Sequence, residues 1–150
     1  MMGVFKRGLA ALALLAVLPV QADEWLVTEQ EARLSRAAPA MPEAKAVPVP
    51  GAPRIVLLQP DVTAAVASPT RIQLRFEPVG EAMIRPDTFK VRYGTLRLDI
   101  TQRITAVSAV TPQGIDVTEA KLPKGAHRLY LEVQDSAGRT GERAVSFVVE

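Results

Sequence analysis

Hydrophobic and polar residues alternate with a period of two over much of the chain from residue 54 onward. The clearest run is 71–76, in which Ile72, Leu74 and Phe76 share one face and arginine or glutamine takes the other. Strict alternation places one face of a strand against a core and the other against water, as in antiparallel sheets. Short β-strands are therefore predicted. Similar alternation, or a short apolar run, occurs at 55–58, 89–93, 96–100, 115–117, 128–133 and 145–149.

Turn-forming residues separate these runs. Gly94-Thr95, Pro112-Gln113-Gly114 and Asp135-Ser136-Ala137-Gly138 each fall between two apolar segments. About seven short strands with turns every 8–12 residues predict an all-β fold, an antiparallel β-sandwich. We place this single domain at residues 54–150.

The segment 101–110 has no clear period, and a strand and a short helical turn both stay open for it. In the helical alternative, Asp99 or Thr101 caps the turn, and Ile104 and Val107 point inward.

Residues 1–22 have the pattern of a secretory signal peptide. Lys6 and Arg7 precede an unbroken apolar run, and Val20-Gln21-Ala22 offers small residues where a signal peptidase reads. The run is shorter than the roughly 20 apolar residues that span a bilayer. We therefore predict cleavage after Ala22, no stable membrane insertion afterwards, and a soluble mature protein in the periplasm.

A short amphipathic helical segment is predicted over residues 23–36. Thr28 followed by Glu31 is a capping box, in which each side chain bonds the other residue's backbone N–H. Only about two turns follow, and isolated helices shorter than about 12 residues are marginal in water. The apolar side chains of this segment therefore need a surface to pack on.

Residues 37–53 form a Pro/Ala-rich linker, because five prolines prevent a continued helix. This linker lets the preceding segment pack on its own domain or fold onto a partner. We favour the partner, with Trp25, Leu26 and Leu34 as the contacting side chains.

Charge and cysteine content exclude several kinds of function. The chain has 18 basic and 16 acidic side chains, and two of the basic ones lie in the predicted leader. The mature protein is thus balanced in charge, and a nucleic-acid partner is not expected. The absence of cysteine excludes disulfides, so an ordinary hydrophobic core must stabilise the domain.

Candidate catalytic chemistry depends on one residue, His127, the only histidine. Zinc or copper sites usually need several His or Cys ligands. No G-x-S-x-G elbow or phosphate-binding glycine loop is present. We therefore expect no enzymatic activity and no cofactor or metal, with His127 in a structural role at the entrance of a strand.

Basic side chains gather at outward-facing positions of neighbouring predicted strands. In the usual sandwich order they share one sheet face with an aromatic ring. Such a patch either protects the sheet and keeps it soluble or contacts an anionic partner. Its members are Lys90, Arg92, Arg97, Arg128 and Tyr130.

Two stretches resemble bacterial immunoglobulin-like (fibronectin type III-like) domains of exported proteins. Residues 122–139 contain L-P-K-G-A-H and V-Q-D-S-A-G-R, similar to the family's L-x-P-G-x-Y and V-x-D-x-x-G-N. Ser68-Pro69 followed by 72–76 is similar to its early S-P … I-x-V-x-F strand. His127 replaces a tyrosine that usually holds a loop. The resemblance implies an immunoglobulin-like sandwich, a fold that commonly serves as an adhesive, spacer or accessory module.

These observations predict a non-catalytic binding or accessory protein of the cell envelope. Its expected partner is an envelope protein or an anionic envelope polymer. Two alternatives stay open: a periplasmic copper-binding sandwich that uses His127, and a purely structural spacer module.

Overall fold

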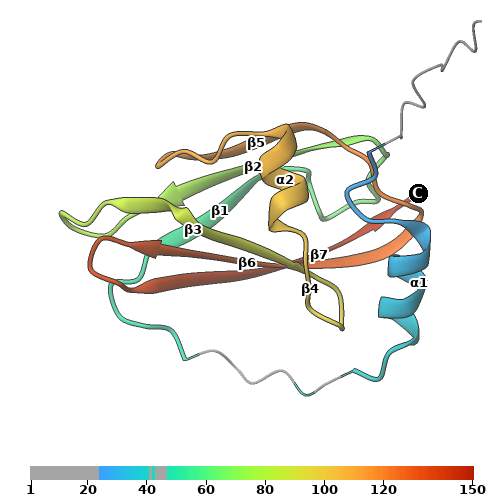
Figure 1. Ribbon diagram of the computed structural model, residues 1–150, viewed down its shortest axis with the longest axis horizontal. Coiled ribbons are helices and arrows are strands. Elements are labelled where there is room, and N and C mark those ends of the chain that lie inside the picture. Colours follow the sequence, from blue (N-terminus) through green and yellow to red (C-terminus); the bar gives the residue numbers. More distant parts are fainter. Residues whose placement is uncertain (1–23, 41, 43–46) are drawn as a thin grey trace, which may run out of the picture.

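The computed structural model describes residues 24–40, 42 and 47–150, which form two antiparallel sheets and two short helices (Figure 1). The first sheet has the order β1-β2-β5, with β1 at Arg54–Gln59, β2 at Thr70–Glu77 and β5 at Gly114–Ala120. The second has the order β4-β3-β6-β7, with β4 at Leu98–Asp99, β3 at Ile84–Tyr93, β6 at Gly125–Asp135 and β7 at Thr140–Val149. The predicted all-β, sandwich-like fold is confirmed.

The predicted leader, residues 1–22, lies outside the described residues, as do positions 41 and 43–46 of the predicted linker. Within the part that is described, no helix has the length and apolar character needed to cross a membrane.

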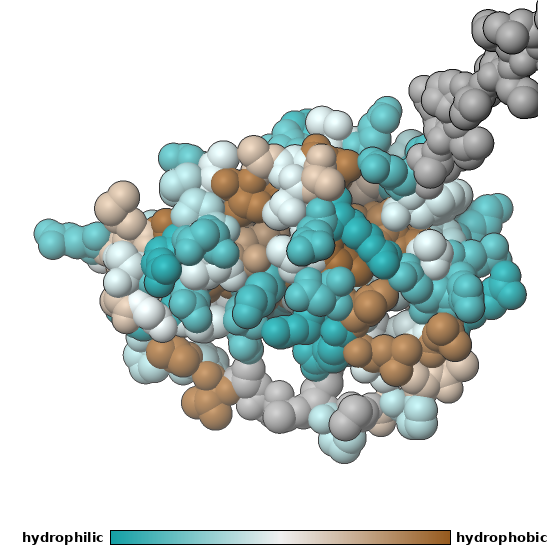
Figure 2. Space-filling model, viewed as in Figure 1, coloured by the Kyte–Doolittle hydropathy of each residue, from teal (hydrophilic) through white to brown (hydrophobic). Residues whose placement is uncertain are grey.

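One hydrophobic core joins the two sheets. The inward positions predicted for β2, Ile72, Leu74 and Phe76, are all buried in it. The ring of Phe76 lies 5.5 Å from that of Phe89 on β3, tilted by 49°, a usual geometry for packed aromatic pairs. The face of the molecule shown in Figure 2 is largely hydrophilic, with apolar side chains in small groups. Alternation along the strands thus separates the core from the solvent-facing side chains.

The strand predicted over 96–100 is wrong for most of its length. β4 has only two residues, and Leu96 and Leu98 are 60% and 36% exposed instead of facing the core. The N–H of Ile100 bonds the carbonyl of Val91 at 3.0 Å, and a helix follows at once. The chain therefore leaves the sheet edge before the alternation can place these leucines inside.

Helix α2 (Thr101–Val107) decides between the two alternatives for the segment 101–110. Asp99 Oδ1 accepts the N–H of Thr101 at 2.9 Å. The N-cap position is Ile100, however, and no side chain caps the helix there, so neither Asp99 nor Thr101 is the predicted cap. Ile104 is buried, as predicted, but Val107 is exposed.

Helix α1 (Glu29–Ala37) begins at the predicted capping box. Thr28 Oγ1 accepts the N–H of Glu31 at 3.2 Å, and the Glu31 carboxylate accepts the N–H of Thr28 at 2.9 Å. These reciprocal bonds satisfy two N–H groups that the first helical turn leaves open.

The segment that contains α1 packs on the sandwich, which corrects the expectation that it reaches a partner through Leu26. Leu26 and Val27 are 5% and 0% exposed and belong to the core. The N–H of Leu26 donates to the carbonyl of Lys121 at 3.0 Å. A helix of this length gains most of its stability from tertiary packing, and its own domain offers that packing. Trp25 and Leu34 stay 44% and 53% exposed.

The far end of α1 is positioned by a close approach to the turn after β3. Ser35 Oγ accepts the N–H of Thr95 at 2.9 Å. Gly94 has a φ of 66°, and a Cβ at this position would overlap the Ser35 hydroxyl. Glycine is therefore required at 94 both for the backbone conformation and for the helix contact.

An ion pair joins α1 to α2. Arg103 donates to the two carboxylate oxygens of Glu31 at 2.7 and 2.8 Å, and to the carbonyl of Leu26 at 3.2 Å. The hydrogen bonds from Arg103 outweigh the effect of burial and lower the pKa of Glu31 to about 2. The carboxylate is thus ionised wherever the protein is folded near neutral pH.

The substitution Glu31→Gln is expected to lower the free energy of unfolding at pH 7, because it removes the ion pair with Arg103. The two side chains are 23% and 38% exposed, so solvent screens the pair in part and limits the loss to about 1 kcal/mol. The folded-state pKa lies below the ordinary value of 4.5, so the stabilisation is present above pH 4.5 and is lost as the pH falls towards 2. Urea unfolding at pH 7 and at pH 2 measures both effects. Glu29→Gln, which breaks only the exposed pair with Arg33, is the control. Equal losses for the two variants at pH 7 would contradict this assignment.

Candidate functional site

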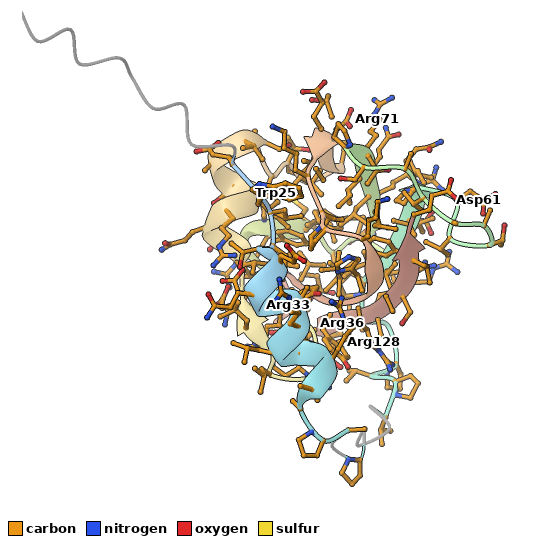
Figure 3. The ribbon with its side chains drawn as sticks, turned by 90° about the vertical axis from the view of Figure 1, so that its right-hand side faces the viewer. Trp25, Arg33, Arg36, Asp61, Arg71 and Arg128 are labelled. Carbon is orange, nitrogen blue, oxygen red and sulfur yellow. The ribbon has the colours of Figure 1, made fainter. Side chains whose placement is uncertain are left out.

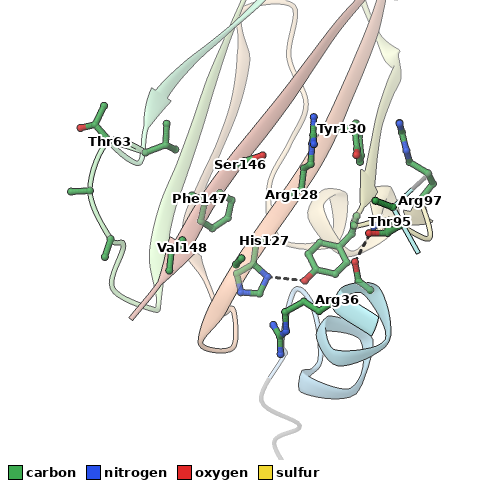
Figure 4. Close-up of a pocket in the computed structure, with 18 of the residues that line it drawn as sticks. Arg36, Thr63, Thr95, Arg97, His127, Arg128, Tyr130, Ser146, Phe147 and Val148 are labelled. Atoms are coloured by element: carbon green, nitrogen blue, oxygen red, sulfur yellow. Dashed lines mark hydrogen bonds between the residues drawn. The ribbon is translucent and has the colours of Figure 1, made fainter. Parts of the chain in front are cut away.

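A groove of about 870 Å³ lies where α1, the turn after β3 and the strands β6 and β7 meet (Figure 4). Three of its lining residues are the arginines Arg36, Arg97 and Arg128, and Tyr130 lies among them. No aspartate or glutamate is among the described residues that line it. The described lining of the groove therefore carries three basic side chains and no acidic one.

Strand β6 contributes Arg128 and Tyr130 to the groove, because inward- and outward-facing residues alternate along it. Leu129 and Leu131 point into the core, so the residues beside them point outward. On β7, the small residues Ser146 and Ala144 pair with Arg128 and Tyr130 respectively. The long side chains of Arg128 and Tyr130 on β6 thus lie beside short side chains on β7.

The turn after β3 brings Arg97 onto the ring of Tyr130. Arg97 has a φ of 53°, in the left-handed region that few non-glycine residues adopt. Its Cζ lies 3.3 Å from the centroid of the Tyr130 ring, and that of Arg128 lies 5.2 Å from it. Contacts of this kind attract a cation to the face of the ring. They hold two guanidinium groups close together despite their like charge.

Arg36 reaches the groove from the last turn of α1. It lies against the backbone of Gly125, where a Cβ would be 2.8 Å from its Nη1. Figure 3 shows Arg36 and Arg128 near one another beside α1, far from Arg71. Sequence reasoning missed Arg36 because only the packing of α1 on the sandwich brings it here.

The structure brings together only part of the predicted basic patch. Arg97, Arg128 and Tyr130 line the groove, whereas Lys90 and Arg92 do not. Arg92 Nη1 lies 3.3 Å from the Glu132 carboxylate, and Lys90 pairs with Glu132 in the β3–β6 register. An acidic neighbour on β6 therefore offsets the basic charge at that end of the sheet.

The other predicted contact residues lie elsewhere. Trp25 lines a separate cavity of about 490 Å³, mostly apolar, with Ala106 and Val107 of α2. Leu34 is exposed but lines neither cavity, and Leu26 is in the core. The three side chains of the predicted docking segment thus do not form one surface.

His127 lies at the base of the groove and is buried. Its Nε2 is 2.6 Å from the carbonyl of Pro123, which can only accept, so Nε2 carries the hydrogen. Nδ1 then accepts the hydroxyl hydrogen of Tyr93 at 2.8 Å. Burial, aided by the charge of Arg36, outweighs the bond to Pro123 and lowers the pKa of His127. The imidazole is therefore neutral, and both nitrogens are occupied by structural hydrogen bonds.

Asp135 forms the hairpin turn between β6 and β7, as predicted. Its fully buried carboxylate accepts the N–H groups of Ala137 and Arg139, both at 3.0 Å, and the Arg139 Nε hydrogen at 2.9 Å. Burial raises its pKa, but these bonds and the charge of Arg139 outweigh that effect and lower it overall. Among the described residues, no three His, Cys, Asp or Glu side chains are close enough together to hold a metal ion.

Comparisons of the chain with protein families, with curated proteins and with solved structures find no match. The groove itself, its charges and the strands around it are therefore the basis for assigning a function.

Proposed function

We propose that this protein is a non-catalytic, exported binding protein of the cell envelope, and that its cationic groove holds an anionic partner. The observation that carries the proposal is the convergence of Arg36, Arg97 and Arg128 on a groove whose described lining contains no carboxylate. Charge decides partners where it is concentrated in a concave surface. This groove is concave, and its three arginines concentrate positive charge in it.

The arginines are suited to an anion with planar or multiple oxygen acceptors. A guanidinium offers five donors in a fixed fork that matches carboxylate or phosphate oxygens. The Tyr130 ring holds Arg97 in place before any ligand arrives. A preorganised side chain loses less conformational entropy on binding.

A binding role agrees better with this site than catalysis does. The one imidazole near the groove uses both nitrogens for Tyr93 and Pro123. A general base or a metal ligand needs a free nitrogen. This geometry favours the binding protein over the copper-binding alternative.

The sandwich that carries the groove is proposed to be of the immunoglobulin-like type. The strand orders support this assignment, because β1-β2-β5 follow one another as strands A, B and E of that fold do, and β3-β6-β7 as strands C, F and G do. The resemblance in residues 122–139 covers the entrance and the end of β6, where His127 and Asp135 hold their turns. Export is proposed from the signal-peptide pattern of residues 1–22.

The combined variant Arg97→Gln, Arg128→Gln is expected to bind polyanions at least ~10-fold more weakly than the unaltered protein, about 1.4 kcal/mol or more. Poly-L-glutamate and polygalacturonate are suitable probes, and calorimetry at low salt avoids screening of the exposed charges.

The matched control is Arg71→Gln, Arg75→Gln. These arginines are exposed on β2, where they pair with Asp116 and Glu77. The control removes the same charge from the other sheet and is expected to bind as the unaltered protein does. Equal weakening in both double variants, or no binding of either polyanion, would refute the proposal.

A further inference from the structure

The outer edge of β7 is open where it borders the groove. β7 pairs with β6 on one side, and on the other side only its last residues have a backbone partner, Val66. The N–H of Val66 donates to the carbonyl of Val148 at 2.8 Å, and the N–H of Glu150 donates to the carbonyl of Val66 at 3.1 Å. Backbone groups alternate in direction along a strand. Those of Ala144 and Ser146 therefore point away from β6 as well.

No backbone group of the described residues bonds the N–H or C=O of Ala144 or Ser146 on this side. Earlier in β7, Gly141 lies against the backbone of Pro53, and the side chain of Arg143 donates to the carbonyl of Ile55 at 3.0 Å. The open edge is thus short and lies between Gly141 and Val148. An exposed strand edge is a template for a further strand.

From this edge and the charge beside it, we infer that the anionic partner is an extended, acidic segment of another polypeptide, which adds to β7 as a further strand. The inference rests on the proposed function and names the chemistry of its partner. A polypeptide supplies the backbone donors and acceptors that match Ala144 and Ser146. An anionic polysaccharide would meet the charges but leave this edge unpaired.

The side chains next to the edge agree with an acidic strand. Ser146 pairs with Arg128 and Ala144 with Tyr130, and both β7 residues are small and exposed. Strands lie about 4.8 Å apart, so outward side chains of an added strand would stand beside Ser146 and Ala144. A glutamate there faces Arg128 across Ser146, and Arg97 lies beyond it on the Tyr130 ring.

The test uses the chain from residue 23 to 150 and a nine-residue peptide of alternating glutamate and valine. Ala144→Pro removes an N–H that points outward and leaves the β6–β7 hydrogen bonds in place. We expect this variant to bind the peptide at least ~10-fold more weakly, about 1.4 kcal/mol. Ala144→Ser keeps the N–H and a small side chain, and is expected to bind within about twofold of the unaltered protein.

Two further measurements keep the inference testable if Ala144→Pro fails to fold. Amide hydrogen exchange at Ala144 and Ser146 in the unaltered protein should slow when the peptide binds. A peptide with N-methyl groups on alternate residues, which cannot donate to β7, should bind at least ~10-fold more weakly. A nine-residue peptide of alternating lysine and valine is the charge control and should not bind.

Strand addition is overturned if the N-methylated peptide binds like the parent and exchange at both residues stays unchanged. If polyanion binding still requires Arg97 and Arg128 in that case, the groove keeps its proposed function, but its partner does not add a strand to β7. Slow exchange at both residues in a self-associated protein without peptide would identify a second copy as the occupant and also overturn the inference. If neither peptide nor polyanion binds, the proposed function itself fails.

Discussion

A chain that begins at Arg54 is expected to lose about 5 kcal/mol of unfolding free energy relative to a chain that begins at Asp23. The truncation removes Leu26 and Val27 from the core, together with buried Ala32 and the Glu31–Arg103 pair. Full burial of a leucine or valine side chain contributes about 1.5–3 kcal/mol. Because small domains have total stabilities of about 5–15 kcal/mol, a loss of this size takes between about a third of that stability and all of it.

This expectation differs from the domain boundary drawn from the sequence, which places the whole folded domain at residues 54–150. Thermal and urea unfolding of the two chains, followed by circular dichroism, measures the difference. Val27→Ala in the longer chain should reproduce part of the loss. Trp25→Ala, at a half-exposed position, is the control and should cost much less. Equal melting temperatures for both chains would show that α1 does not stabilise the sandwich.

The substitution His127→Ala is expected to lower the free energy of unfolding by about 3 kcal/mol. It leaves the Tyr93 hydroxyl and the Pro123 carbonyl without partners in a buried place. It also opens a cavity beside Phe147, whose ring centroid lies 5.7 Å from that of the imidazole. Tyr93→Phe removes only one of the two hydrogen bonds and should cost about 1 kcal/mol. A smaller loss for His127→Ala than for Tyr93→Phe would contradict this role.

His127 should also make the free energy of unfolding decrease as the pH falls. Burial lowers the folded-state pKa of His127 below its ordinary value of 6.5. The unfolded chain therefore binds a proton first as the pH falls, and stability decreases from about pH 6.5 towards the lowered pKa, by up to about 1.4 kcal/mol per pH unit. Urea unfolding between pH 7.5 and 5 tests this, and His127→Ala should lack the slope. Stoichiometric copper or zinc binding that disappears in the variant would refute the structural role.

Local signals explain why much of the fold is predictable from the sequence. The strands follow from alternation, the start of α1 from Thr28 and Glu31, and the last hairpin from Asp135. Each depends on residues close together in the chain. Alternation predicts Leu96 and Leu98 inside, but both are exposed. The bond from Ile100 to Val91 turns the chain away from the sheet edge, and the hydrophobic period carries no signal of that turn.

The candidate groove was predictable only in part, for the same reason. Arg128 and Tyr130 follow from the alternation of β6, and Arg97 from its place near the neighbouring strand. Arg36 and Ser35 depend on where α1 docks, which the linker left open. The open edge of β7 depends on where Val66 stops covering it. The docking of α1 and the cover of β7 by Val66 are tertiary contacts, which no local pattern in a single sequence predicts.

The docking of α1 and of the residues just before it on the sandwich also bears on when the domain can fold. Arg103 bonds the Leu26 carbonyl 77 residues away, and Arg143 bonds the Ile55 carbonyl 88 residues away. Domains that depend on such distant pairings fold slowly, in milliseconds to seconds, because long loops must close first. A ribosome must also make Lys121 before Leu26 has its backbone partner. For the export proposed from the pattern of residues 1–22, this delay favours a chain that crosses a membrane unfolded and folds only on arrival.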